Sequence, residues 1–162
     1  MPIAPGSAAP DLAALDLEGR PFRLAPLWAT GPALLFFFKD ECAACEVAAP
    51  VLPRFAAVPG LALAAVCQDG PGPARAMAAA AGWGPAVRCL VDPEPWSASE
   101  LLGLRSTPTW VLVDRGGRVT AVAEGWSRDD ANGLAVRAAT LAGSAAPVVA
   151  RPDGPEPALR PG

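Results

Sequence analysis

Two cysteines, Cys42 and Cys45, are separated by two residues and closely follow an apolar run at 33–38. The segment that they open, residues 42–57, has the spacing of an amphipathic helix. A cysteine at a helix start faces backbone N–H groups that lack partners within the helix, and these favour the thiolate. Two intervening residues also bring the sulfurs within bridging distance. The spacing predicts disulfide exchange, with Cys42 as the exposed attacking thiol and Cys45 as the resolving thiol.

A C-x-x-C pair has two other interpretations, half of a structural zinc site or two inert buried thiols. The remaining cysteines, Cys67 and Cys89, stand alone, and the chain contains no histidine. This set of donors disfavours zinc, so we predict no metal site. Cys67 and Cys89 each lie near the end of a predicted strand, where they are either small buried side chains or auxiliary thiols that relay a disulfide. Their spacing does not distinguish these two roles.

Strands and helices alternate along the chain, which predicts an α/β fold with a central mixed β-sheet flanked by helices. Pro50 should kink the helix that begins with the cysteines. Asp129 or Asp130 should cap the last helix, which Gly143 should end. The predicted elements are an N-terminal β-hairpin within 11–24, strands at 33–38, 61–67, 86–91, 110–113 and 119–123, and helices at 42–57, 73–83, 95–102 and about 129–141.

Length and composition predict one domain. The chain has 162 residues, of which 52% are hydrophobic, and this is enough to bury a core without disulfide staples. We expect an extended arm rich in Pro, Ala and Gly at 1–10, a folded domain at 11–143, and a flexible Ala/Pro-rich tail at 144–162. We also expect a monomer.

Charge argues against nucleic acid as a partner, and hydropathy argues against a membrane-spanning segment. The net charge is -3 without a basic cluster, so we expect no binding of nucleic acid. No apolar stretch is long enough to span a bilayer, and residues 1–6 lack the basic and apolar regions of a signal peptide. We therefore expect the chain, as given, to be cytoplasmic, or extracytoplasmic if an upstream signal or anchor was removed.

A second motif, Ser106-Thr107-Pro108-Thr109, stands directly before the strand predicted at 110–113. With the C-x-x-C pair and the order of the elements, it resembles the thioredoxin superfamily over residues 5–142. This resemblance implies a thioredoxin-like fold in which the Thr107–Pro108 peptide bond is cis and packs against the C-x-x-C pair. It also implies that the Thr107 backbone pairs with an extended substrate.

Two further segments are similar to the redoxin branch of that superfamily, which includes peroxiredoxins and bacterial thioredoxin-like reductases. The opening at 5–12 resembles its G-x-x-A-P-x-F/L pattern, and 15–24 resembles its D-x-x-G-x-x-x-x-L hairpin. Gln68-Asp69 and the segment 91–94 match the places where that branch inserts an extra strand and helix. The resemblance therefore implies an inserted βα unit.

Three positions depart from the reductase pattern. Glu41, at the edge of the expected substrate groove, stands where thioredoxin-like reductases usually carry Trp. Phe36 replaces the buried Asp of thioredoxin, and Ala48 replaces a Glu that many reductases of the redoxin branch carry. The resolving thiol therefore lacks its usual buried proton acceptor. Glu41 and Glu46 oppose thiolate formation, and Lys39 would partly offset them.

The segment 38–45 also resembles the peroxiredoxin pattern P-K-D-x-T-x-x-C. In that alignment Cys45 would be the peroxidatic cysteine, Cys42 would replace the Thr, and Arg105 would stabilise the thiolate. The Pro and the Thr of the pattern are lost, whereas Pro108 is typical of thioredoxins, so the motif count favours a reductase.

The sequence thus predicts a thiol–disulfide oxidoreductase that exchanges disulfides with a protein partner and receives electrons from a thiol donor. No organic cofactor is implied. Two alternatives stay open, a thiol peroxidase that uses Cys45 or Cys42, and a non-catalytic binding module. Trp110 and Trp126 are candidates to line the partner groove.

Overall fold

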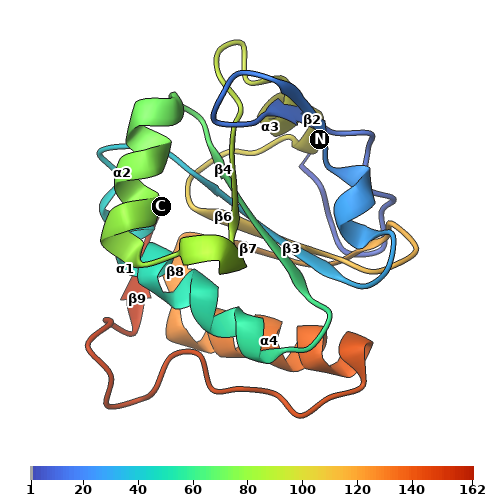
Figure 1. Ribbon diagram of the computed structural model, residues 1–162. Coiled ribbons are helices and arrows are strands. Elements are labelled where there is room, and N and C mark those ends of the chain that lie inside the picture. The colour runs from blue at the N-terminus through green and yellow to red at the C-terminus, as the bar shows by residue number, and fades with distance from the viewer. Residues whose placement is uncertain (1) are drawn as a thin grey trace.

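The computed structural model describes residues 2–162, so Met1 of the predicted arm lies outside the described residues. Within this range, one mixed sheet contains β1 (Ala13–Leu15), β2 (Pro21–Arg23), β3 (Ala33–Phe38), β4 (Ala62–Cys67), β5 (Arg88–Val91), β6 (Thr109–Val113) and β7 (Val119–Glu124). The strand order is β2-β1-β5-β4-β3-β6-β7 (Figure 1). The N-terminal hairpin and the inserted β5 lie together on one side of the sheet.

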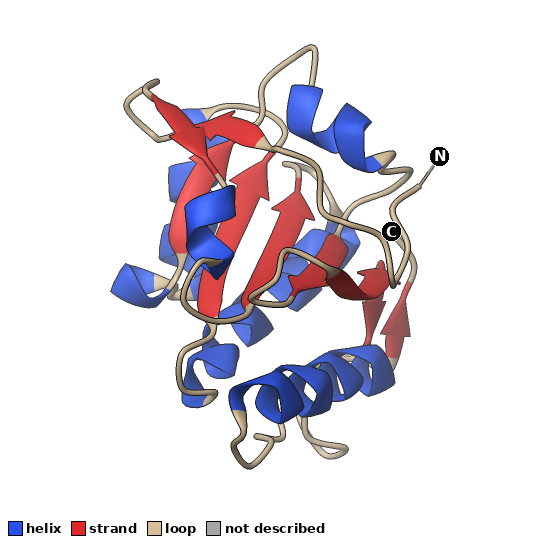
Figure 2. Cartoon of the chain, turned by 90° about the vertical axis from the view of Figure 1, so that its right-hand side faces the viewer, coloured by secondary structure: helices blue, strands red, loops and turns tan. Residues whose placement is uncertain are grey.

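Helices cover both faces of this sheet (Figure 2), which confirms the predicted fold class. None of the helices within residues 2–162 is long and apolar enough to cross a membrane. The α-helices are α1 (Ala43–Ala48), α2 (Pro71–Ala81), α3 (Ser97–Leu102) and α4 (Arg128–Ala142), and the 3-10 helices are η1 (Ala25–Trp28), η2 (Ala49–Ala57) and η3 (Gly84–Ala86).

The central strand β3 is buried on both faces, as its continuous apolar run predicts. All six of its residues are 0% exposed. Phe36 packs into the core formed with α1, η2 and α4, whereas Phe37 packs into the core formed with η1 and α3. The Phe36 ring lies 4.6 Å, centroid to centroid, from the ring of Trp110 in the neighbouring strand. This strand is therefore the rigid support for whatever follows Phe38.

The segment predicted as one kinked helix at 42–57 is two helices of different type. The α-helix ends at Ala48, and η2 continues as a 3-10 helix through Ala57. Pro50 and Pro53 both lack a backbone N–H, so two consecutive turns cannot complete the α-helical hydrogen bonds. The break is more than a kink because the second proline prevents the α-helix from resuming.

The last helix begins one residue earlier than predicted and has a different cap. Ser127 is its N-cap, and its hydroxyl accepts a hydrogen bond from the N–H of Asp130 at 3.2 Å. Asp129 and Asp130, the predicted caps, lie in the first turn instead. Gly143, in the left-handed conformation with φ of 67°, ends the helix as predicted.

The pairing of β3 with β6 brings two distant loops together. The strands run antiparallel, with Phe37 opposite Thr109. The loop that leaves β3 and the loop that enters β6 therefore emerge at the same edge of the sheet. Residues 39–42 and 106–108 meet there.

Residues 144–162 pack against the domain, in contrast to the flexible tail that their composition predicts. Val149 and Ala150 are 1% and 0% exposed. The side-chain oxygen of Asn132 in α4 accepts from their N–H groups at 3.0 and 3.1 Å, and its NH₂ group donates to the Ala150 carbonyl at 2.7 Å. A single asparagine that binds irregular backbone produces no periodic pattern, so the sequence carried little signal of this contact.

The end of the same segment forms a second, small sheet. There β9 (Leu159–Arg160) pairs antiparallel with β8 (Trp126–Ser127), which directly precedes α4. In Figure 1 the chain leaves the end of α4, returns beneath that helix and rises to β9 beside α1.

We predict that Phe36→Ala lowers the free energy of unfolding by about 3–5 kcal/mol, because it removes a fully buried ring and leaves a cavity beside Trp110. Urea denaturation monitored by tryptophan fluorescence and by circular dichroism measures the change. Val136→Ala, at a position 54% exposed on α4, is the control and should change stability by about 0.5 kcal/mol or less. Equal effects of the two substitutions would contradict the packing described for β3.

Candidate active site

Cys42 and Cys45 lie at the sheet edge where β3 ends. Cys42 is the N-cap residue of α1, and Cys45 lies in the first turn of that helix. Their Cα atoms are 5.1 Å apart and their sulfurs form a disulfide. Cys42 is 7% exposed and Cys45 is 0% exposed. Cys42 is therefore the more accessible of the two, although it is more buried than the sequence predicts for an attacking thiol.

Two hydrogen-bond donors point at the sulfur of Cys42. The backbone N–H of Cys45 donates at 3.2 Å and the hydroxyl of Thr107 at 3.6 Å. Such donors stabilise negative charge on the sulfur once the disulfide is reduced. The carbonyl oxygen of Thr107, 3.5 Å from the same sulfur, can accept a hydrogen bond from the protonated thiol. The sulfur thus has a partner in either protonation state.

The Thr107–Pro108 peptide bond is cis, which confirms the expectation drawn from the resemblance. The loop around it is held by its own hydrogen bonds. The carbonyl of Pro108 accepts from the N–H of Gly125 at 2.7 Å, and the hydroxyl of Thr109 donates to the carbonyl of Ser106 at 2.7 Å. Thr107 is 6% exposed, and its side chain and carbonyl both face Cys42.

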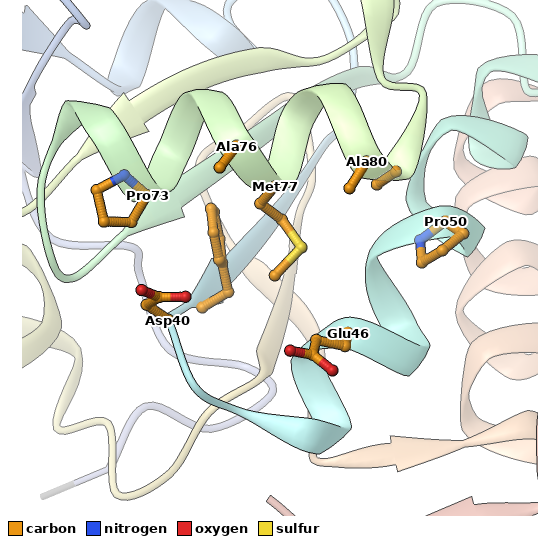
Figure 3. A pocket seen from close by; sticks show the side chains of 9 residues that line it. Asp40, Glu46, Pro50, Pro73, Ala76, Met77 and Ala80 are labelled. Atoms are coloured by element: carbon orange, nitrogen blue, oxygen red, sulfur yellow. The ribbon is translucent and has the colours of Figure 1, made fainter.

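Carboxylates surround the first turn of α1. Asp40, Glu41 and Glu46 are exposed, and the N–H of Asp40 donates to a side-chain oxygen of Asp69 at 2.6 Å. Glu41 has a φ of 50°, which residues other than glycine rarely adopt. Asp40 and Glu46 also border a pocket of about 370 Å³ between α1 and α2, toward which Met77 projects (Figure 3). The approach from α2 is therefore apolar with a negative rim.

A second pocket, of about 320 Å³, is lined by Thr107 and by Trp96, which the sequence did not indicate as a groove residue. Trp96 is 41% exposed, and its indole N–H donates to the carbonyl of Gln68 at 2.9 Å. Trp110 and Trp126, the predicted groove residues, are 2% and 1% exposed and belong to the core. The proline-rich loop before α3 is the only sequence signal that singles out Trp96.

Among the described residues 2–162, no buried acid lies next to Cys45. Phe36 and Ala48, which replace the family's carboxylates, are both 0% exposed. Within residues 2–162, the buried carboxylates are Asp92 and Glu156, and both have other partners. Asp92 accepts hydrogen bonds at the start of α3, and Glu156 forms an ion pair at 2.7 Å with an arginine of η2.

Within residues 2–162, neither Arg105 nor Lys39 forms a hydrogen bond with Cys42 or Cys45. Arg105 donates to Glu124 at 3.2 Å, and its side chain is 68% exposed. The peroxidase alternative requires this guanidinium beside Cys45. Lys39 is exposed and borders the pocket that contains Trp96.

Cys67 and Cys89 are free thiols on the neighbouring strands β4 and β5. Burial raises the pKa of the Cys67 thiol to about 11, and burial together with the nearby Cys67 raises the pKa of Cys89 to about 11. Both are therefore protonated at neutral pH, and a protonated thiol is a poor nucleophile. The structure favours the interpretation of these residues as small packing side chains, with Cys67 buried and Cys89 half-buried.

We predict that Cys67 and Cys89 make the oxidised protein less stable at alkaline pH. Their folded pKa values, about 11, exceed the ordinary value of 9.0, so the unfolded chain loses these protons first. Their contribution to stability is complete below pH 9 and is lost as the pH rises toward 11. Urea denaturation at pH 8 to 10.5 should show a smaller decline for the Cys67→Ala/Cys89→Ala double variant. Parallel declines in the two proteins would contradict the raised pKa values.

Solved structures with the same fold include thiol–disulfide exchange proteins. A putative thiol:disulfide interchange protein DsbE from Chlorobium tepidum is 25% identical, with a TM-score of 0.70 over 86% of this chain and 99% of that chain. DsbF of MTB, described in mixed oxidised and reduced forms, is 26% identical, with a TM-score of 0.68 over 81% of this chain and 95% of that chain.

A third structure extends the fold comparison. A putative protein disulfide isomerase from Bacteroides thetaiotaomicron has a TM-score of 0.75 over 88% of this chain and 92% of that chain. At 17% identity it is evidence for the fold alone. No curated protein sequence matches the chain.

A family model gives the more specific assignment. The family described as "TraF: F plasmid transfer operon protein" matches residues 27–130. This span includes β3, both cysteines of the disulfide, and the Thr107–Pro108 bond. Because the match extends over more than half of the sequence, the chain belongs to this TraF family, and its fold is that of the thioredoxin superfamily.

Proposed function

We propose that the chain is a thiol–disulfide oxidoreductase that reduces disulfides in a protein partner through Cys42 and Cys45. The observation that carries the proposal is the surroundings of the Cys42 sulfur. It lies at the start of a helix, accepts from two donors, and adjoins the backbone of Thr107 at the edge of the sheet. Similar structures described as thiol:disulfide interchange proteins support the same class of chemistry.

The reaction transfers two electrons in two exchange steps. The Cys42 thiolate attacks one sulfur of the partner's disulfide, an S–S bond forms between chain and partner, and the partner's other sulfur leaves as a thiolate that takes up a proton. Cys45 then loses its proton and attacks the Cys42 sulfur. The Cys42–Cys45 disulfide forms and the partner is released as a dithiol. A separate thiol donor reduces the disulfide of the chain by the same chemistry in reverse.

Thr107 has two roles in this proposal. Its hydroxyl stabilises the Cys42 thiolate as the attacking group of the first step. Its backbone pairs with an extended segment of the partner, which aligns the partner's disulfide with Cys42. Glu41, exposed beside Cys42, borders the same approach and favours partner segments without negative charge there.

The peroxidase alternative receives little support from the geometry. A peroxidatic Cys45 must meet peroxide, yet Cys45 is 0% exposed. Arg105, the residue that would stabilise its thiolate, is bonded to Glu124.

A non-catalytic binding module is the second candidate, and one observation favours it. The positions that carry proton acceptors in related reductases are occupied by Phe36 and Ala48, both fully buried. Deprotonation of Cys45 then depends on solvent or on the exposed carboxylates, which slows the second exchange step. In a binding module, Cys42→Ser would leave partner binding and cellular function intact.

We predict a reversible two-electron transition confined to Cys42 and Cys45. The protein is equilibrated in glutathione or dithiothreitol buffers of graded potential, free thiols are alkylated, and mass spectrometry identifies the modified cysteines. A midpoint more reducing than that of the glutathione couple supports a reductant. A strongly oxidising midpoint would reverse the proposed direction, and the absence of a reversible bridge at any potential would leave a binding module.

We predict that Cys45→Ser accumulates a mixed disulfide with oxidised insulin, because the variant completes the first exchange step and cannot complete the second. Non-reducing gels and intact mass measure the adduct. Turnover of insulin should fall roughly a hundredfold or more in Cys45→Ser and in Cys42→Ser.

Two controls make this test specific. Cys42→Ser should form no adduct, and Cys89→Ser should keep the turnover of the unmodified chain. An adduct on Cys45 in the Cys42→Ser variant would show that Cys45 can attack, and would contradict the assignment of Cys42 as the attacking thiol.

A further inference from the structure

Residues 157–162, which we call the strap, lie along the outer edge of β8. Leu159 pairs with Ser127 and Arg160 pairs with Trp126, in antiparallel register. The strap therefore adds one strand to the short β8, in the manner of an extended peptide that binds to an exposed strand edge.

Two hydrogen bonds at the start of the strap hold it to the same elements. The indole N–H of Trp126 donates to the carbonyl of Pro157 at 2.7 Å. The backbone N–H of Arg128 donates to the carbonyl of Ala158 at 2.9 Å. Trp126, a core residue that is 1% exposed, is thus bonded directly to the strap.

The far end of the strap reaches the active-site loop. A Cβ atom added at Gly162 would lie 2.5 Å from the carbonyl oxygen of Thr107, and one added at Gly125 would lie 2.9 Å from the Gly162 nitrogen. Only glycine permits such close approach of one backbone to another. The same Thr107 oxygen lies 3.5 Å from the Cys42 sulfur. The strap therefore covers the backbone that faces the reactive sulfur.

The segment before the strap is held much more firmly than the strap. Glu156 is 8% exposed and forms an ion pair at 2.7 Å with Arg54. The guanidinium of Arg128 also donates to the Glu156 carbonyl. By contrast, Leu159 is 66% exposed, and the residues after it are exposed as well. Residues up to Glu156 can stay bound while the strap lifts away.

We propose that the edge of β8, together with Gly125 and Thr107, is the docking strip for an extended polypeptide segment of the partner, and that the strap occupies this strip until the partner displaces it. The proposal rests on the proposed function, and it adds the class of partner and a competitor built into the chain. Small disulfides do not need to pair along the strip and are far less affected by the strap.

The competition has a measurable consequence. A partner can dock only on the fraction of molecules whose strap is released, so its apparent affinity is reduced by that fraction. If about one molecule in ten is open, permanent release strengthens the apparent affinity about tenfold.

The test is Arg160→Pro in the full chain, because proline lacks the N–H needed in a strand pair and weakens the strap. We expect kcat/KM for reduction of insulin to rise roughly five- to tenfold, mainly through a lower KM. Reduction of 2-hydroxyethyl disulfide should change less than about twofold. An unchanged rate with insulin, or equal increases with both substrates, would overturn the proposal.

Ala146→Pro is the matched control, because it places proline at an exposed position of the same segment outside the strap. It should leave both rates at the level of the unmodified chain. An increase equal to that of Arg160→Pro would show that general loosening of the segment, rather than release of the strip, is responsible.

A second measurement uses the unmodified chain and does not depend on activity. Reduced, S-methylated insulin B chain is titrated into the ¹⁵N-labelled oxidised protein, and the indole N–H resonances are followed by NMR. The signal of Trp126 should shift as its bond to Pro157 breaks, whereas that of Trp83, bound to the carbonyl of Ala49 in the core, should not. A constant Trp126 signal at saturating binding would overturn the proposal.

The two measurements separate this proposal from the function on which it rests. If the chain reduces neither insulin nor the small disulfide, the proposed function fails. The NMR titration still decides whether a bound polypeptide displaces the strap.

Discussion

The antiparallel pairing of β3 with β6 is the constraint on which the site depends. A chain that leaves β3 at Phe38 and a chain that enters β6 at Thr109 must meet at one edge of the sheet. Cys42 and Thr107 are 65 residues apart in sequence and reach hydrogen-bonding distance because of this register. Since both strands are packed on both faces, a one-residue slip would turn every side chain into the opposite core, where it does not fit. The precision of the site therefore comes from the burial of the strands beneath it.

The electrostatic balance around Cys42 combines opposing contributions. An N–H and a hydroxyl favour a thiolate on its sulfur, whereas the exposed carboxylates of Asp40, Glu41 and Glu46 oppose it. The donors are in direct contact with the sulfur, and the carboxylates are in solvent, where water and salt screen them. The local donors should therefore dominate. Around Cys45 the environment is apolar, since the side chain packs in the same core as Phe36 and Trp110.

The strap explains the glycine at position 125 and the partner of the Trp126 indole N–H. Both follow from a backbone that lies directly on β8 and on the loop before β6. The firm attachment of Glu156 and the exposed surface of Leu159 divide this segment into a fixed part and a part that can be released. In the proposed function, partner binding would therefore replace the strand of the strap with a strand of the partner.

Local chemistry and periodicity determined much of this protein from the sequence alone. Three features involve only residues that are adjacent in sequence, and the sequence therefore predicts them: the spacing of Cys42 and Cys45, the apolar run of β3, and the proline after Thr107. Only the tertiary structure decided the rest. The contact of Asn132 with Ala150, the exposure of Trp96 and the path of the strap depend on residues far apart in sequence. Such contacts rest on individual hydrogen bonds and on backbone shape, which have no period, and their sequence signal disappears among residues typical of loops.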